Sequence, residues 1–236
     1  MDSYASLETL PPVLPLDRTR QAAPQVFEQL REQILAIRLV PGAVLSRLAL
    51  QRAFGLSQTP IRDALSRLAE EGLVDVFPQH ATRVSRIHLG LARQAHFLRV
   101  AIELEVVRVV AEAPPPATLE RLQAMLGEQE RLLAAADYGA LTAGDASFHR
   151  ELYLTAGMPD LWEMVRQKSG HIDRLRRLNL PDPGKAEAVV HDHGRLLAAL
   201  RQGDPGAAQA ALRAHLSGTL RSVDQIRARH PGYVAE

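Results

Sequence analysis

Apolar side chains recur every three or four residues through three short segments near the start of the chain. The first segment runs from Pro24 to Ile34, where Pro24 can open a helix. The second follows Ser46, a favourable N-cap residue, and the third runs from Ser57 to Gly72. Because this spacing matches the period of an α-helix, the pattern predicts three consecutive helices, with Ser57 capping the third.

The periodicity changes after Gly72. The stretches "LVDVF" and "TRVSRI" are rich in β-branched residues, and "PQHA" separates them. This pattern predicts a small β-hairpin. Three helices followed by a hairpin, within residues 24–88, outline a winged helix-turn-helix, a domain that places its recognition helix in the major groove of DNA.

From residue 90 to residue 230 the chain shows helical periodicity and no further strand pattern. Breaks rich in proline and glycine separate about six expected helices at 91–112, 117–136, 138–156, 160–178, 186–202 and 205–228. Residues 1–23 contain several prolines and predict a disordered tail. The expected fold is therefore mainly α, with a winged helix-turn-helix domain at 24–88 and an all-α bundle at 90–230.

Composition excludes several classes of function. The 236 residues carry a formal net charge of +1, so any anion-binding site must arise from local clustering of charge. The chain has no cysteine, which excludes disulfides, thiolate metal sites and cysteine nucleophiles. No apolar run approaches the roughly 18 residues of a membrane span, and the first residues do not resemble a signal peptide. We therefore expect a cytoplasmic protein with no membrane partner.

The third predicted helix has a polar outer face at its N-terminal end. Gln58, Thr59 and Arg62 lie on that face, where glutamine suits adenine and arginine suits guanine or phosphate. Nearby arginines on the preceding helix, the same helix and the hairpin are candidates for phosphate contacts: Arg47, Arg67 and Arg83. The alternative is an ordinary solvated face in which Asp63 and Arg67 form an ion pair four residues apart.

The stretch "PGAVLSRLALQRAFGLSQTPIRDALSRLAEEGLV" resembles the DNA-binding half of GntR-type transcription regulators. This resemblance covers residues 24–87 and implies a winged helix-turn-helix, with Arg62 as the best-matched DNA contact. The sequence departs from the family pattern at Gln58, Arg47 and Ala81. These departures predict an unusual operator.

The second half contains three histidines and one aspartate on apolar helix faces. Asp145 and His149 are four residues apart and share one face, while His193 and His215 lie in the apolar stripes of two later helices. A single inward histidine is usually a hydrogen-bonded core residue. Four such groups facing one core are costly to bury unless a divalent cation pairs them. Their nitrogen and oxygen donors suit zinc first, with nickel, manganese or iron as alternatives.

The segments "DASFH", "HGRLLAALRQGDPGAAQAALRAHL" and "FLRVAIELEVVRVVAE" resemble the helical effector domain of the FCD type. That resemblance implies a metal site formed by Asp145, His149, His193 and His215. It also implies that Arg99 lies near a bound effector, although Arg99 has the spacing for an ion pair with Glu103.

These patterns predict a ligand-responsive transcription regulator and not an enzyme. We expect a homodimer on a palindromic double-stranded operator, one divalent metal per chain, and a small carboxylate effector that modulates DNA binding. Two alternatives remain at this point. The helical bundle could form a metal-dependent hydrolase or lyase, or the regulator could hold a purely structural metal.

Overall fold

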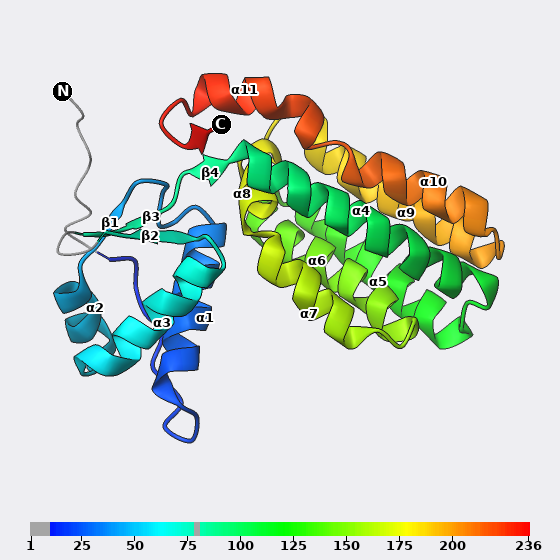
Figure 1. The fold of residues 1–236 in the computed structure, drawn as a ribbon. Helices are drawn as coiled ribbons and strands as arrows, with labels where there is room; N and C mark the ends of the chain where they lie inside the picture. The colour runs from blue at the N-terminus through cyan, green and yellow to red at the C-terminus, as the bar shows by residue number, and fades with distance from the viewer. Residues whose placement is uncertain (1–9, 78–80) are drawn as a thin grey trace. The chain divides into compact units, whose positions relative to one another are not determined.

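The computed structural model describes residues 10–77 and 81–236, which form two compact units. The first unit comprises Met1–Ala92 and Arg227–Glu236, and the second comprises Arg93–Ile226. The chain therefore passes between the units twice, after Ala92 and after Ile226. Figure 1 labels helices α1 to α11 and strands β1 to β4.

The first unit has the predicted order of three helices followed by a hairpin. Its elements are α1 (Ala22–Leu35), β1 (Val44–Leu45), α2 (Arg47–Phe54), α3 (Gln58–Glu70), β2 (Val74–Val76), β3 (Thr82–Val84), β4 (Ile87–His88) and β5 (Val234–Ala235). The apolar faces of the helices meet in one core that includes Leu30, Leu50, Ile61 and Leu68. The winged helix-turn-helix expected from the helical and strand patterns is therefore present.

The wing is a three-stranded antiparallel sheet in the order β1-β3-β2. Val74 pairs with Val84 and Val76 with Thr82, as a hairpin requires. The sequence did not predict β1, which pairs Val44 with Arg83, because a two-residue strand is too short to show alternation. The expected hairpin turn at 78–80 lies outside the described residues.

The turn between α2 and α3 depends on local chemistry. Ser46 caps α2, and its side chain accepts a hydrogen bond from the amide of Ala49 at 3.2 Å. Gly55 ends α2 with a φ of 64°, which a residue without Cβ adopts at little cost. Ser57 occupies the N-cap position of α3, but its side chain makes no capping bond, so the predicted Ser57 cap is only positional. Pro24 lies in the first turn of α1, two residues after its start.

Residues 12–17 lie along α1 in this structure, although the sequence predicts a disordered tail through residue 23. The side-chain amide of Gln33 donates to the carbonyl of Pro12, and that of Gln29 donates to the carbonyl of Leu14. The amide of Asp17 donates to Gln25 at 2.8 Å. Glutamines on α1 thus hold this segment, while residues 1–9 lie outside the described residues.

The second unit is a helical bundle. The helices that contribute to it are α4 (Leu89–Glu112), α5 (Pro116–Ala134), α6 (Tyr138–Thr155), α7 (Pro159–Lys168), α8 (Gly170–Asn179), α9 (Lys185–Arg201), α10 (Pro205–Leu216), the 3-10 helix η1 (Leu220–Ser222) and α11 (Val223–Arg229). Two helices expected to be continuous are broken, and each break occurs at a Ser-Gly pair, Ser169–Gly170 or Ser217–Gly218. Such pairs interrupt helices because glycine lacks Cβ and serine competes for backbone bonds.

The chain ends in a short strand that the sequence did not predict. β5 pairs in parallel with β4, so that Ile87 lies opposite Val234 and His88 opposite Ala235. The amide of Ile87 donates to the carbonyl of Tyr233 at 2.8 Å. Both pairing strands belong to the first unit, and β4 leads directly into α4. The C-terminal segment is therefore fastened to the residues that connect the two units.

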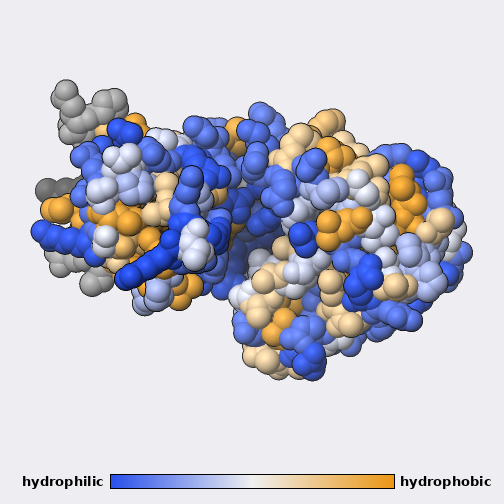
Figure 2. Space-filling view, turned by 90° about the horizontal axis from the view of Figure 1, so that it is seen from below, coloured by the Kyte–Doolittle hydropathy of each residue, from blue (hydrophilic) through white to orange (hydrophobic). Residues whose placement is uncertain are grey.

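Apolar residues of the second unit form a separate core in which α9 packs against α5 and α10, and α5 packs against α6. On the face drawn in Figure 2, apolar surface residues lie in small groups among hydrophilic ones. Across residues 10–77 and 81–236, no helix combines the length and apolarity that a membrane span requires.

Candidate metal centre and DNA-binding helix

The structure brings together the four residues that the sequence singled out as metal ligands. Asp145 and His149 lie on α6, His193 on α9 and His215 on α10, and all four are buried. One donor atom from each lies within 4.8 Å of the others. Helical spacing places Asp145 and His149 on one face, and the packing of α9 and α10 supplies the two remaining side chains.

The donor atoms converge around one carboxylate oxygen. Oδ1 of Asp145 lies 3.8 Å from Nε2 of His149, 3.6 Å from Nε2 of His193 and 3.4 Å from Nε2 of His215. The Nε2 atoms of His149 and His215 are 3.1 Å apart. Three imidazole nitrogens and one carboxylate oxygen therefore face a common point.

Two polar residues orient the histidine rings from behind. Nδ1 of His149 lies 2.7 Å from Oε2 of Glu103 on α4, and Nδ1 of His193 lies 2.7 Å from Oε1 of Gln129 on α5. Gln129 uses its amide nitrogen to donate to the carbonyl of Gly144, so its oxygen faces His193. The proton of His193 is thereby placed on Nδ1, and Nε2 presents a lone pair to the other donors.

Burial and neighbouring charges set the protonation states that metal binding requires. Burial and the nearby His215 hold the pKa of His193 well below its ordinary value, and burial also lowers the pKa of His215. Burial opposes the ionisation of Asp145, but Arg176 and His215 hold its pKa well below the usual range. Neutral imidazoles and an ionised carboxylate are the ligand forms that bind divalent cations.

The donor set fits a divalent metal on its own chemistry. Oδ1 of Asp145 and Nε2 of His193 are buried and have no hydrogen-bond partner among the described residues. Unpartnered buried polar atoms are rare because each forfeits its hydration. A cation at the common point would satisfy both atoms, and a site of three imidazoles and one carboxylate suits zinc, nickel, manganese or iron.

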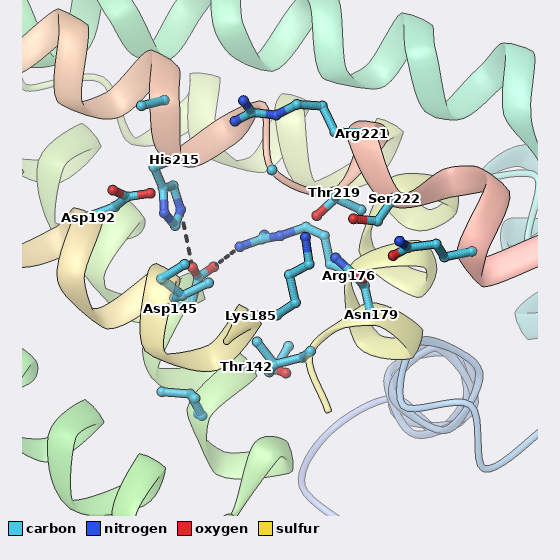
Figure 3. Close-up of a pocket in the computed structure, with 17 residues that line it drawn as sticks. Thr142, Asp145, Arg176, Asn179, Lys185, Asp192, His215, Thr219, Arg221 and Ser222 are labelled. Atoms are coloured by element: carbon cyan, nitrogen blue, oxygen red, sulfur yellow. Dashed lines mark hydrogen bonds and ion pairs between the residues drawn. The ribbon is translucent and has the colours of Figure 1, made fainter. Parts of the chain in front are cut away.

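A pocket of about 430 Å³ adjoins this cluster and is lined by Asp145 and His215. Its polar lining comes from several helices and includes Thr142, Arg176, Asn179, Lys185, Asp192, Thr219, Arg221 and Ser222. Figure 3 shows Asp145 contacting both His215 and Arg176, and Nη2 of Arg176 donates to Oδ2 of Asp145 at 2.6 Å. The cluster therefore borders a space large enough for a small molecule.

Arg99, the arginine expected near an effector, does not line this pocket. It is 5% exposed, and its Nε forms an ion pair with Oε1 of Glu103. Burial opposes its charge, but Glu103 raises the pKa of Arg99. Arg99 therefore makes the ion pair with Glu103 that its spacing indicated. Glu103 in turn contacts His149, so Arg99 reaches the cluster only through Glu103.

The candidate DNA contacts lie on the first unit. Gln58, Thr59 and Arg62 are exposed at the N-terminal end of α3. Nη2 of Arg62 lies 3.2 Å from Oδ1 of Asp63. Arg62 is therefore the partner of Asp63, in place of the Asp63–Arg67 pair considered from spacing.

The other arginine candidates differ in their surroundings. Arg47 is exposed at the start of α2, and Arg83 is half-buried on β3. The guanidinium of Arg67 lies over the ring of Phe27, 4.2 Å from its centroid. This cation–π contact joins α3 to α1, so packing also accounts for Arg67.

Sequence reasoning missed Glu103, Gln129, Arg176 and Lys185 around the cluster. Each is a polar residue on an amphipathic helix, and nothing in its spacing separates it from solvent-facing neighbours. A signal exists only for Glu103, whose position four residues after Arg99 indicates a helical ion pair. That pairing gives no indication that Glu103 also contacts His149.

The chain is similar to known bacterial regulators along most of its length. Residues 22–84 match the gntR family of bacterial regulatory proteins, and residues 94–218 match the FCD domain. An uncharacterized HTH-type transcriptional regulator from an unstable DNA locus of Streptomyces ambofaciens is 34% identical over 206 residues, covering 87% of this chain and 86% of that protein. The HTH-type transcriptional repressor RspR of Escherichia coli K12 is 27% identical over 221 residues, covering 94% of this chain and 97% of the repressor.

The same fold occurs in a solved structure. E. coli McbR/YncC superposes with a TM-score of 0.76 at 23% identity, covering 89% of this chain and 99% of that one. The relatives are transcription regulators and not enzymes. This chain therefore belongs to the GntR family of bacterial transcription regulators, with a DNA-binding helix-turn-helix unit followed by an FCD domain.

Proposed function

We propose that the helical unit binds one divalent metal through Asp145, His149, His193 and His215, and a small organic acid in the adjoining pocket. Binding of the acid then changes the affinity of the protein for its operator. One observation supports this proposal above the others: Asp145 and His215 belong to the four-residue cluster and also line the 430 Å³ pocket. A ligand in the pocket would therefore lie beside the metal.

Zinc is the first choice of metal, with nickel, manganese and iron as alternatives, because imidazole and carboxylate donors suit all four. When bound, the metal supplies a positive centre for oxygen atoms of an acid. On a six-coordinate ion such as manganese or iron, four protein ligands would leave about two positions, whereas zinc, which usually takes four ligands, would have to expand its coordination to bind the acid. A carboxylate with a neighbouring hydroxyl or keto oxygen has the geometry to fill both.

Arg176 is better placed than Arg99 to bind the acid's carboxylate. Arg176 lines the pocket and contacts Asp145, whereas Arg99 is paired with Glu103 and does not line this pocket. Guanidinium groups bind carboxylates through two parallel hydrogen bonds. We therefore assign the contact with the acid to Arg176, and to Arg99 the indirect role of holding Glu103 against His149.

The DNA-binding unit acts through the N-terminal end of α3, where Gln58, Thr59 and Arg62 are exposed. Arg47, Arg67 and Arg83 are assigned to phosphate contacts, which orient a protein on DNA without reading its sequence. One recognition helix reads few base pairs, so we propose a homodimer on a palindromic operator in the cytoplasm.

The C-terminal segment offers a route between the two activities. Thr219, Arg221, Ser222 and Gln225 line the pocket, and the same segment continues through α11 to β5. β5 is hydrogen-bonded to β4, which follows the wing and leads into α4. An acid that changes the position of residues 219–225 would act on the connection to the DNA-binding unit. We expect binding of the acid to release the protein from its operator.

Elemental analysis and calorimetry test this proposal together. Purified protein should load about one zinc, nickel or manganese ion per chain, and His193→Ala should abolish stoichiometric loading. His191→Ala is the matched control, because His191 is exposed on the same helix. A candidate acid should bind loaded wild type and weaken its operator binding. Failure to load any of these metals would overturn the metal site.

Calorimetry with chelator-stripped protein separates a ligand-binding metal from a structural one. We expect stripped protein to lose acid binding while it remains folded. Acid binding that survives stripping undiminished would assign the metal a purely structural role. A saturating acid that leaves operator affinity unchanged would exclude that acid as the effector.

A further inference from the structure

Lys185 is a cation of the pocket lining that forms no ion pair in the part of the chain that the structure describes. It is the first residue of α9, lines the pocket, and has no carboxylate within 4.0 Å of its ammonium group in residues 10–77 and 81–236. A positive charge at the N-terminus of a helix opposes the helix dipole. The lysine therefore does not stabilise α9, and its charge is available to a molecule in the pocket.

Arg221 adds a second cation to the lining. Its Nε donates to the carbonyl of Ser217 at 3.3 Å, and no carboxylate of the described chain forms an ion pair with it. The pocket's two carboxylates have other neighbours: Asp145 pairs with Arg176, and Asp192 lies 3.9 Å from Nη1 of Arg195. The positive charges of Lys185 and Arg221 are therefore not neutralised by the two carboxylates of the pocket.

Asn179 indicates a further ligand group. Its side-chain oxygen is buried and has no hydrogen-bond partner in the described part of the chain, and the residue is 4% exposed on the pocket wall. Asn179 follows Arg176 by three residues on α8, so the two side chains share one helix face (Figure 3). A buried acceptor requires a donor, and a hydroxyl next to a carboxylate held by Arg176 would supply one.

We propose that this pocket selects a 2-hydroxy acid that carries a second anionic group. We also propose that Lys185 determines the preference for this dianion over a monoanion. The inference rests on the proposed acid-binding function and specifies its ligand class. One carboxylate lies at Arg176 and the metal side, with its hydroxyl at Asn179. The second anionic group, a carboxylate, lies at Lys185 and Arg221.

The test compares acids of equal carbon number on the full-length, metal-loaded protein. Isothermal titration measures 2-hydroxyglutarate, a dianion, against 2-hydroxyvalerate, a monoanion, in wild type and Lys185→Gln. Lys168→Gln is the matched control, because Lys168 is the only other lysine and lies on α7 outside the pocket. Glutarate, which lacks the hydroxyl, is measured against 2-hydroxyglutarate in wild type and Asn179→Ala. A further arm uses 3-phosphoglycerate, whose second anionic group is a phosphate.

Wild type should bind the dianion at least about 10-fold more tightly than the monoanion, because only the dianion forms a charge-assisted hydrogen bond with Lys185. Lys185→Gln should bring this ratio close to 1, while Lys168→Gln leaves it unchanged. The preference for 2-hydroxyglutarate over glutarate should fall in Asn179→Ala. Tighter binding of 3-phosphoglycerate would overturn the carboxylate assignment in favour of a phosphate at Lys185.

Equal affinity of wild type for the two hydroxy acids, or an unchanged ratio in Lys185→Gln, would overturn the inference. Absence of binding by every dianion to protein with one metal per chain would also overturn it, while the proposed metal site would stand. The converse result separates the two proposals. If metal-stripped protein still prefers the dianion to the monoanion, and Lys185→Gln removes that preference, the metal does not take part in acid binding. The assignment of Lys185 would then hold.

Discussion

Nδ1 of His149 lies 2.7 Å from Oε2 of Glu103, and both side chains are almost completely buried. The other oxygen of Glu103 pairs with Arg99, so three charged or polar groups link α4 to α6 beneath the histidine cluster. Burial opposes ionisation of Glu103, but Arg99 and His149 lower its pKa to about 2. The carboxylate is therefore ionised at neutral pH and stabilises a proton on Nδ1 of His149, which leaves Nε2 free to bind a cation.

Removing the charge of Glu103 should weaken metal binding. Glu103→Gln is expected to lower metal affinity by about 10- to 100-fold, because partners behind a histidine ligand set its orientation and basicity. Competition with a chromophoric chelator measures the affinity. Glu105→Gln is the control, since Glu105 is an exposed residue of the same helix that pairs with Arg108. Equal affinities in the two variants would contradict a role for Glu103.

The metal-free protein should lose stability as the pH falls below neutrality. The pKa values of His193 and His215 are lowered in the folded state, mainly by burial, whereas in the unfolded chain they revert to about 6.5. Below that pH the unfolded state binds more protons, so the free energy of unfolding decreases. The lowered pKa values of Glu103 and Asp145 add a further loss only below about pH 4.5, where the unfolded carboxylates protonate.

Urea denaturation of chelator-treated protein between pH 7.5 and pH 5 checks this dependence. His193→Gln removes one titrating group and should give a flatter profile than wild type. A wild-type free energy of unfolding that does not change over this range would show that the buried histidines do not resist protonation.

Arg62→Ala should weaken specific DNA binding by about 1–3 kcal/mol if Arg62 reads a base edge. The side chain is exposed near the start of α3, and it would have to give up its contact with Asp63 to reach DNA. Band-shift titration measures the affinity for the DNA upstream of the gene that encodes this protein, at a fixed salt concentration. Arg38→Ala removes an exposed arginine that pairs with Glu32 and serves as the control. Unchanged affinity and footprint in Arg62→Ala would exclude this contact.

Val234→Asp should uncouple acid binding from DNA binding. Val234 is a buried residue of β5 opposite Ile87, and a carboxylate there would disrupt the pairing with β4. The variant should retain its affinity for the acid and for the operator, measured separately. The coupling free energy between acid binding and operator binding, typically about 1–3 kcal/mol, should decrease. The decrease should be the same whether it is measured as the effect of the acid on operator affinity or of the operator on acid affinity. Ala235→Ser, on the same strand, is the control, and full coupling in Val234→Asp would rule out this route.

Local sequence patterns were enough to predict the helices, apart from the breaks at Ser169–Gly170 and Ser217–Gly218, and the hairpin of β2 and β3. They also singled out Asp145, His149, His193 and His215. Apolar periodicity separates inward from outward positions within one helix, because the period of the α-helix is the same everywhere. Asp145 and His149 needed only local spacing, while His193 and His215 were identifiable as polar residues within apolar stripes. The match to the GntR pattern likewise depended on residues close together in the chain.

The residues that surround Asp145, His149, His193 and His215 depend on how the helices pack in three dimensions. Glu103, Gln129 and Arg176 come from three further helices, and their roles depend on the packing of α4, α5 and α8 around α6 and α9. The pairing of β5 with β4 joins residues at distant points in the sequence through strands of two residues each, too short for any periodic pattern. Periodicity reports which face of a helix is buried, but it contains no information on the neighbour that covers that face.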